Sequence, residues 1–239
     1  MLVGQNLSKI YNKKSVVKNV TIKVKQGEII GILGPNGAGK TTSFFMLAGV
    51  VKPYTGTIYL NNIDITRLSL SARANMGVVY LPQEISVFRG MNVSENILTA
   101  LEIIEPNLDK RMKKLEEILA DFSIEHLRFS SATSLSGGER RKLELARCIA
   151  INPKYLLLDE PFAGIDPISI NSIILLIKSL KNKGLGVLIT DHNVKEALSV
   201  IDRAYIIFNG EVIAFDDKKN ITKNKQVQRI YLGENFLSK

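Results

Sequence analysis

The chain has 239 residues, of which 45% are hydrophobic and 23% are charged. These are ordinary values for a globular protein, so global disorder is excluded, and the length predicts one or two domains. No apolar run reaches the roughly 18 residues that span a bilayer, and the first residues lack the apolar stretch of a secretory signal. The single cysteine, Cys148, excludes an internal disulfide. We therefore expect a soluble protein of a reducing compartment.

The net charge is +9, from 32 basic and 23 acidic residues. A nucleic-acid-binding protein would gather such charge in a patch and place aromatic residues among the basic ones for base stacking. Here the basic residues are scattered in twos and threes, and aromatic residues do not interleave with these groups as stacking platforms would. The pattern favours a solvated, lysine-rich surface, which would also suit an anionic membrane leaflet. We expect no nucleic-acid partner.

The amino-terminal stretch alternates apolar and polar residues, with Val20 and Ile22 on one face. Farther along, two predicted strands at 57–60 and 63–65 flank Asn61–Asn62, a pair that is typical of a hairpin turn. Together these segments predict a small antiparallel layer beside a main sheet.

Three short apolar runs, at 28–33, 155–158 and 185–190, predict buried strands of a parallel sheet, because helices cover both faces of such a sheet. Polar residues follow each run directly. The carboxyl ends of adjacent parallel strands are where open α/β sheets place their ligand site. The fold class is therefore α/β, with the site at these strand ends.

Between residues 94 and 153 apolar residues recur at three- and four-residue spacing, most regularly at Leu115, Ile118, Leu119 and Phe122. This spacing predicts helices inserted between the strands. The sequence has no internal repeat and no low-complexity segment. We expect a single domain over 1–239, with a helical subdomain at about 94–153 and a carboxyl-terminal tail at about 216–239.

A glycine-rich segment follows the first buried run and precedes a helix predicted at 42–48. It consists of Gly34, Pro35, Asn36, Gly37, Ala38, Gly39, Lys40, Thr41 and Thr42. Glycines allow backbone N–H groups to turn towards a triphosphate, Lys40 places a positive charge on the outer phosphates, and the Thr41 hydroxyl can bind Mg²⁺. The segment predicts a nucleoside-triphosphate site.

Two adjacent carboxylates, Asp159 and Glu160, follow the second buried run. Beside a phosphate-binding loop, Asp159 is suited to the metal and Glu160 to polarising an attacking water. An acidic turn at the end of a strand would be the alternative if the pair stood alone.

A third motif precedes the helix predicted at 140–150. It consists of Leu135, Ser136, Gly137, Gly138 and Glu139. Ser136 can cap the helix, and the two glycines leave its first amides open to an anion. An ordinary capped helix would also explain this segment in isolation.

Along the chain the three motifs follow one another at 34–42, 135–139 and 159–160. In that order they resemble the ATP-binding cassette family, and the resemblance covers nearly the whole chain. The resemblance implies a P-loop NTPase core with an antiparallel β subdomain and an inserted helical subdomain. It also implies an Mg-dependent ATP hydrolase in which Gln83, Glu160 and His192 are catalytic, and in which Mg²⁺ is bound by Thr41, Gln83 and Asp159. Tyr11 stands where the family stacks an aromatic ring on adenine.

Family geometry places residues 135–139 against the phosphate loop of a second copy, and Asp166 in the loop that crosses between the copies. The resemblance thus implies a head-to-tail homodimer that ATP closes and hydrolysis reopens. It further implies two integral membrane subunits, which would dock at 84–93 through Phe88 and Arg89, and no direct contact with the transported molecule. Packing of Phe88 inside its own domain is the alternative.

Longer segments, among them PQEISVFRGMNVSENI, SLSGGERRKLELARCIA and LDEPFAGIDPIS, resemble the ATPases of lipopolysaccharide export systems. That resemblance implies extraction of lipopolysaccharide from the inner membrane of Gram-negative bacteria, with the chain held at the cytoplasmic face by the membrane subunits. Departures are concentrated at 102–117 and in the lysine-rich segment 218–225. The ATPase of a branched-chain amino-acid importer or another ABC transporter stays the alternative.

Overall fold

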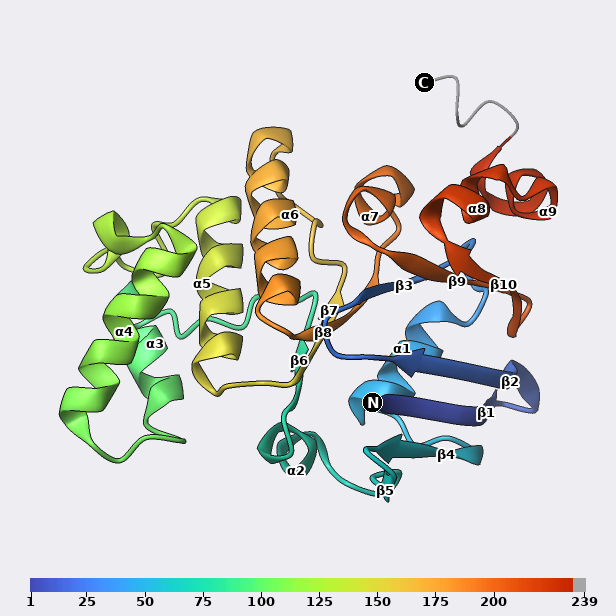
Figure 1. Cartoon of the computed structure of the whole chain (residues 1–239), viewed down its shortest axis with the longest axis horizontal. Coiled ribbons are helices and arrows are strands. Elements are labelled where there is room, and N and C mark those ends of the chain that lie inside the picture. Colours follow the sequence, from blue (N-terminus) through green and yellow to red (C-terminus); the bar gives the residue numbers. More distant parts are fainter. Residues whose placement is uncertain (234–239) are drawn as a thin grey trace.

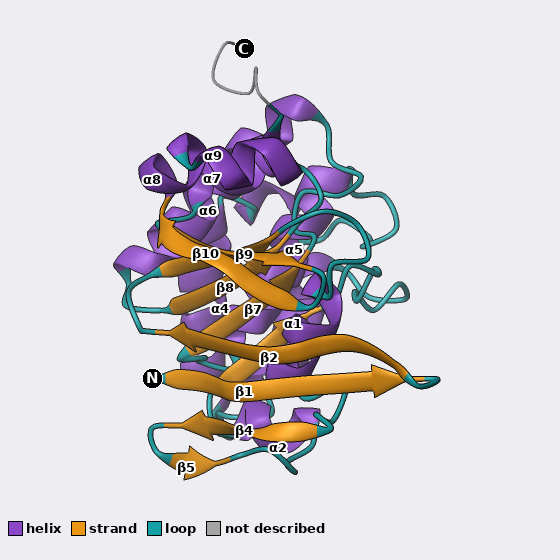
Figure 2. Ribbon diagram, turned by 90° about the vertical axis from the view of Figure 1, so that its right-hand side faces the viewer, coloured by secondary structure: helices purple, strands orange, loops and turns teal. Residues whose placement is uncertain are grey.

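The computed structural model describes residues 1–233, so the end of the predicted tail, 234–239, lies outside the described residues. Its strands form two sheets, one antiparallel with the order β2-β1-β4-β5 and one with the order β10-β9-β3-β8-β7-β6 (Figures 1 and 2). The first sheet contains β1 (Leu2–Tyr11), β2 (Lys14–Val24), β4 (Thr55–Leu60) and β5 (Ile63–Asp64). The second contains β3 (Ile29–Leu33), β6 (Val78–Leu81), β7 (Tyr155–Asp159), β8 (Gly186–Thr190), β9 (Arg203–Phe208) and β10 (Glu211–Asp217).

Helices pack beside the second sheet and at one end of the molecule (Figure 1). They are α1 (Lys40–Ala48), α2 (Leu70–Asn75), α3 (Val93–Leu101), α4 (Leu108–Phe122), α5 (Gly137–Ala150), α6 (Pro167–Asn182), α7 (Val194–Val200), α8 (Lys218–Lys223) and α9 (Lys225–Val227), with a 3₁₀ turn at Glu125–Leu127 and a π-helical turn at Gln228–Leu232. Within residues 1–233, none of them combines the length and the apolar character needed to cross a membrane.

The predicted antiparallel layer is confirmed, and so is its hairpin between β4 and β5. Asn61 and Asn62 form the turn with φ angles of 47° and 68°. Asparagine tolerates this left-handed conformation, which a two-residue hairpin turn requires.

The three predicted buried strands are confirmed as parallel neighbours in the order β3-β8-β7. Successive side chains of β3 enter different cores because strand side chains alternate between faces. Ile29 and Leu33 pack with α3 to α7 in one core. Ile30 and Ile32 pack with α1 and the antiparallel sheet in the other. Burial on both faces explains why these strands are continuously apolar. Their parallel pairing places their carboxyl ends at the same edge of the sheet.

Helix α1 begins at Lys40, two residues before its predicted start. Gly39 makes this early start possible, because its φ of 102° turns the loop directly into the helix. At the other end the buried guanidinium of Arg73 donates to the carbonyl oxygens of Met46 (3.0 Å) and Leu47 (2.6 Å). Burial lowers the pKa of Arg73 to about 10. The last carbonyls of α1 are therefore satisfied by a side chain from α2.

Helices α3, α4 and α5 pack against one another at the end of the molecule farthest from β1 and β2 (Figure 1). A capping box between Asn92 and Glu95 begins α3, and Asn107 caps α4. The apolar spacing of α4 is confirmed, since its predicted core residues are buried. Helix α5 leads the chain back to the amino-terminal end of β7. The start of α5, at Gly137, therefore lies beside the loop that follows β7, where a Cβ atom on Gly137 would meet Gly164.

Candidate nucleotide site

The glycine-rich loop between β3 and α1 folds around its own lysine. The Lys40 ammonium donates to the carbonyl oxygens of Gly34 (2.7 Å) and Pro35 (2.9 Å). Burial lowers the pKa of Lys40, while the nearby Glu160 carboxylate acts in the opposite direction. Thr41 is exposed on the first turn of α1. The loop thus holds a partly buried cation beside a helix N-terminus, which is a favourable place for an anion.

Gly34 is required by the close approach of the neighbouring strand. Its φ is 147°, and a Cβ atom there would lie 2.0 Å from the carbonyl oxygen of Ile207 in β9. Any side chain at this position would therefore separate the loop from the sheet.

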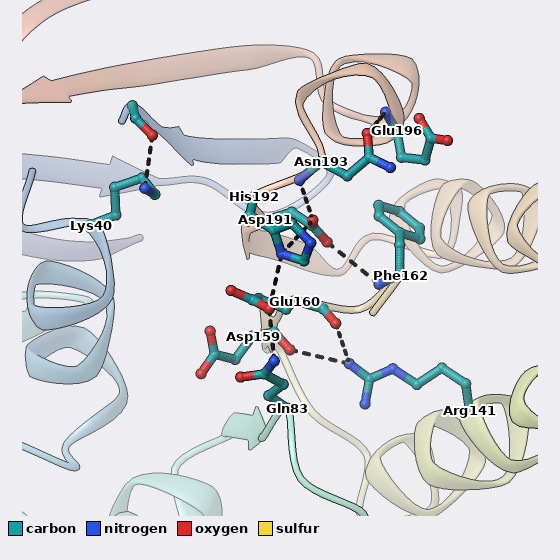
Figure 3. A network of polar contacts seen from close by, with 11 residues as sticks. Lys40, Gln83, Arg141, Asp159, Glu160, Phe162, Asp191, His192, Asn193 and Glu196 are labelled. Atoms are coloured by element: carbon teal, nitrogen blue, oxygen red, sulfur yellow. Dashed lines mark hydrogen bonds and ion pairs between the residues drawn. The ribbon is translucent and has the colours of Figure 1, made fainter. Parts of the chain in front are cut away.

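The ends of β6, β7 and β8 bring together three of the predicted residues, Gln83, Glu160 and His192 (Figure 3). Gln83 Nε2 donates to Glu160 Oε2 at 2.8 Å. His192 Nδ1 lies 3.1 Å from the same oxygen. Glu160 has a φ of 45°, an uncommon value for a residue other than glycine, asparagine or aspartate. Such strain is typical of a side chain that its surroundings hold in one direction.

Asp159 lies deeper than Glu160 and is buried at the end of β7. Its side chain accepts one long hydrogen bond, from the Tyr80 hydroxyl at 3.5 Å. Burial, followed by the charge of Glu160, raises the pKa of Asp159 to about 6. A buried carboxylate with so few donors is suited to a cation.

The side-chain oxygens of Thr41, Gln83 and Asp159 would be sufficient to bind Mg²⁺ only if a nucleotide supplied further oxygen ligands. Within residues 1–233, no group of three histidine, cysteine, aspartate or glutamate side chains is placed to hold a metal. Mg²⁺ in such sites commonly takes one or two carboxylates, waters and substrate phosphates. Three oxygen ligands of this hard kind are present here: the carboxylate of Asp159, which accepts a single long hydrogen bond, the hydroxyl of Thr41 and the amide oxygen of Gln83.

Asp191 holds the turn that carries His192. Its buried carboxylate accepts the backbone N–H of Asn193 at 2.7 Å and of Phe162 at 3.4 Å. Burial raises the pKa of Asp191, and the two backbone donors oppose this shift. The residue thereby joins the loops after β7 and β8 (Figure 3).

Arg141 on α5 is a residue that the sequence reasoning missed. Its buried guanidinium donates to the carbonyl oxygens of Pro82 (3.2 Å), Pro161 (3.1 Å), Asp159 (3.2 Å) and Glu160 (3.3 Å). It also forms a buried pair with Glu144 at 3.0 Å, and Glu144 accepts the backbone N–H of Ser86 at 2.9 Å. The pair therefore ties α5 to the segments that carry Gln83 and Glu160. In the sequence, the local sign of this role is that Arg141 and Glu144, which have opposite charges, stand three residues apart beside the leucines of α5.

The predicted capping role of Ser136 is confirmed: it begins α5 in a capping box with Glu139. Hydrogen bonds from Ser136 lower the pKa of Glu139. Both glycines are needed for packing, because a Cβ atom on Gly137 would lie 2.9 Å from the carbonyl oxygen of Gly164, and one on Gly138 would lie 2.5 Å from Cβ of Ser169. The motif thus packs against the turn that leads into α6.

Asp166 caps α6 by accepting the backbone N–H groups of Ile168 (3.1 Å) and Ser169 (2.9 Å). Hydrogen bonds from the side chain and then the backbone of Ser169, with a smaller effect from the backbone of Ile168, lower the pKa of Asp166. Tyr11 lies exposed at the end of β1, with the Lys9 ammonium 5.2 Å from its ring centre. None of the hydrogen bonds within residues 1–233 joins Tyr11, Asp166 or the 135–139 motif to Lys40, so the structure does not bring these predicted residues into one polar network.

Phe88 and Arg89 lie on the segment between β6 and α3. The Phe88 ring is 45% exposed, with the guanidinium of Arg147 4.4 Å from its centre. Arg147 also donates to the carbonyl oxygen of Ser86, at the edge of a cavity of about 240 Å³. Arg89 lines a second cavity of about 170 Å³. The Phe88 side chain is therefore not buried in its own domain, but one part of its surface is covered by Arg147.

Comparison with known proteins decides the family. Residues 17–163 match the model of the ABC transporter family. The chain is 52% identical to an ABC transporter ATP-binding protein of Rhizobium meliloti, over 98% of this chain and 87% of that one. It is 50% identical to the lipopolysaccharide export system ATP-binding protein LptB of Escherichia coli K12, over 98% of both chains. The chain belongs to the ABC transporter family.

Solved structures agree with this assignment and with the predicted P-loop NTPase fold. The ADP conformation of MJ1267, an ATP-binding cassette of an ABC transporter, gives a TM-score of 0.86 at 30% identity, over 98% of this chain and 99% of that one. The dimeric bacterial ABC transporter cassette MJ0796 gives 0.79 at 25% identity, over 91% and 99%. This chain is the ATPase subunit of an ABC transporter, and cassettes of its family form dimers.

Proposed function

We propose that this ABC ATPase hydrolyses Mg-ATP between two copies of itself and thereby powers lipopolysaccharide export through separate integral membrane subunits. The observation that carries the proposal is the 50% identity to LptB over 98% of both chains.

In the proposed site the loop from Gly34 to Thr42 surrounds the phosphates of ATP. Lys40 would exchange its two loop carbonyls for phosphate oxygens, which are better partners for a partly buried ammonium. Tyr11, which is exposed at the end of β1, would pack against the adenine ring. Mg²⁺, when bound by Thr41, Asp159 and Gln83, supplies charge neutralisation at the β- and γ-phosphates.

Glu160 is the proposed general base. Gln83 and His192 both contact Oε2, so Oε1 of Glu160 is available to a water on the nucleotide side. As that water attacks the γ-phosphorus, the carboxylate takes its proton and the bond to the β-phosphate oxygen breaks, giving ADP and phosphate. His192 and Gln83 hold the carboxylate in place, and His192 would also reach the γ-phosphate.

A second copy of the chain is needed to complete the site. Each chain has one glycine-rich loop and one LSGGE motif, and Figure 1 shows α1 and α5, which follow them, in separate parts of the molecule. In a head-to-tail homodimer Leu135, Ser136, Gly137, Gly138, Glu139 and Asp166 of one copy would face the ATP of the other. A closed two-fold arrangement of this kind satisfies both sites at once.

Phe88 and Arg89 are the proposed contacts with the membrane subunits. The half-exposed Phe88 ring, the adjacent cavity of about 240 Å³ and the cation of Arg147 form a surface suited to a short helix with an apolar side. Such docking would hold the ATPase at the cytoplasmic face of the inner membrane. The chain is a single domain, and its helical subdomain at 94–153 would face the membrane subunits.

The proposal is tested by isolating the chain with its membrane subunits from detergent-solubilised inner membrane and reconstituting the complex in liposomes that contain lipopolysaccharide. ATP-dependent release of lipopolysaccharide is expected. Phe88→Ala should lower recovery of the membrane subunits, whereas Leu175→Ala, an exposed apolar residue on α6, should not. Co-isolation of amino-acid importer subunits without lipopolysaccharide release would contradict the proposal.

A further inference from the structure

Tyr80, in β6, is a residue to which the mechanism above gives no role. Its ring lies edge to face with two rings of α1, and its ring centre is 6.0 Å from that of Phe44 and 6.2 Å from that of Phe45. Aromatic pairs of this geometry are favourable and restrict the direction of each ring. Tyr80 is therefore held by the helix whose first turn carries Thr41, a proposed Mg²⁺ ligand.

The Tyr80 hydroxyl reaches a second proposed ligand, Asp159. Side chains of a strand alternate between faces, so Asp159 lies on the same face of β7 as Leu157, which packs in the core that contains α1. Tyr80 stands opposite Leu157 in the pairing of β6 with β7. Its hydroxyl lies 3.5 Å from Asp159 Oδ2. An ionised carboxylate only accepts hydrogen bonds, so the phenol is the donor in this contact.

The other carboxylate oxygen of Asp159 is left for a metal. Within residues 1–233 the only hydrogen bond to this carboxylate is the one that Oδ2 accepts from Tyr80. Arg141 donates to the backbone carbonyl of Asp159 at 3.2 Å, and Figure 3 shows the carboxylate pointing away from Arg141. Carboxylates that bind a metal are themselves oriented by hydrogen bonds from neighbouring groups. Among the described residues, Tyr80 is the side chain placed to do this for Asp159.

We propose that Tyr80 is a positioning residue of the Mg²⁺ site, whose hydroxyl holds Asp159 Oδ2 and thereby directs Oδ1 towards the metal. One side chain then connects the three proposed ligands. Thr41 is on the helix that packs against the Tyr80 ring, Gln83 follows Tyr80 in the same segment, and Asp159 accepts from the hydroxyl. A phenylalanine would keep the ring contacts and lose the hold on the carboxylate. The inference rests on the proposed binding of Mg-ATP.

Tyr80→Phe tests the proposal because it removes only the hydroxyl. Tyr155→Phe is the matched control, since the hydroxyl of Tyr155 has no partner within residues 1–233 and lies at the opposite end of β7 from Asp159. The probe is Mn²⁺, titrated into protein in molar excess over the non-hydrolysable analogue AMP-PNP, so that no free nucleotide competes for the metal. Electron paramagnetic resonance measures the free Mn²⁺. Tyr80→Phe should bind Mn²⁺ about tenfold more weakly than the wild type, which is the lower end of the effect of losing a group that orients a metal ligand, and Tyr155→Phe should match the wild type.

A second readout separates metal positioning from general damage to the fold. AMP-PNP affinity in EDTA should be the same for Tyr80→Phe and the wild type, and an excess of Mg²⁺ should restore the kcat of the variant. Equal Mn²⁺ affinities, or a loss of AMP-PNP affinity in EDTA that equals the loss of Mn²⁺ affinity, would overturn the inference and leave the proposed function intact. If the wild type with AMP-PNP binds no Mn²⁺, the proposed Mg-ATP site fails, and the role of Tyr80 fails with it.

Discussion

The Nδ1 atom of His192 lies 3.1 Å from Oε2 of Glu160, although 32 residues separate them along the chain. The contact joins the ends of β8 and β7, and Gln83 approaches the same oxygen from the end of β6. The strands on either side of β7 are thus each followed by a side chain that contacts the carboxylate of Glu160.

Replacing His192 should slow hydrolysis without weakening nucleotide binding. Because His192→Ala removes a hydrogen bond to a charged group, we expect kcat to fall about ten- to hundredfold, with the ATP Kd within about twofold of the wild type. Steady-state turnover and equilibrium ATP titration check this. His126→Ala is the control, since His126 is exposed on the 3₁₀ turn and should behave as the wild type. Loss of ATP affinity in His192→Ala would assign the residue to binding instead.

Ser136→Arg should prevent dimer closure and leave ATP binding to the monomer intact. An arginine side chain would occupy the surface that, in the proposed dimer, faces the γ-phosphate of the ATP bound to the second copy. It also removes the cap of α5, at a cost of about 1 kcal/mol. Ser69→Arg removes the equivalent cap of α2, where Ser69 accepts the backbone N–H of Ala72. Light scattering with ATP, in a Glu160→Gln background, should show a monomer for the first variant and a dimer for the second.

Arg141→Met should destabilise the chain strongly, because it leaves the buried carboxylate of Glu144 without its cation. Breaking such a pair costs about 3–5 kcal/mol, which denaturant unfolding would measure. The surface pair of Arg128 with Glu116 gives the contrast, and Arg128→Met should cost less than about 1 kcal/mol. In the double variant Arg141→Met/Glu144→Leu, stability should return in part but kcat should stay low, since the carbonyls of Asp159 and Glu160 have lost their donor. Recovery of full activity would contradict the positioning role of Arg141.

Asp159 should make stability depend on pH in the metal-free chain. Its pKa in the fold is about 6, against an ordinary value of 3.8, so the folded chain keeps a proton that the unfolded chain has released. The carboxyl therefore lowers stability as the pH rises from about 4 to 6, and its effect is complete above that window. Asp159→Asn should gain stability over the wild type at pH 8, by on the order of 2 kcal/mol, and less at pH 5. Urea unfolding at both pH values measures this. The same difference in unfolding free energy between Asp159→Asn and the wild type at pH 5 and pH 8 would refute the prediction.

Much of the site could be predicted because its residues follow buried strands directly. The apolar runs locate the strands, and parallel pairing places Glu160 and His192 at one edge. Arg141 could not be predicted in the same way. Its guanidinium donates to backbone carbonyls, which every residue type possesses, so the sequence does not show which residues accept. The nearest of these acceptors, Asp159, is 18 residues away.

The early start of α1 was beyond prediction for a related reason. It depends on the φ of Gly39, which a helix pattern in side chains does not encode.

The most direct test of the proposed cycle is the oligomeric state of Glu160→Gln with Mg-ATP. Glutamine keeps the size of the side chain but cannot accept the proton of the water, so ATP should bind and remain at the dimer interface. Size-exclusion chromatography with light scattering should show a stable dimer with ATP and a monomer with ADP. A variant that stays monomeric with ATP, and whose two copies remain apart in the assembled complex, would contradict the account.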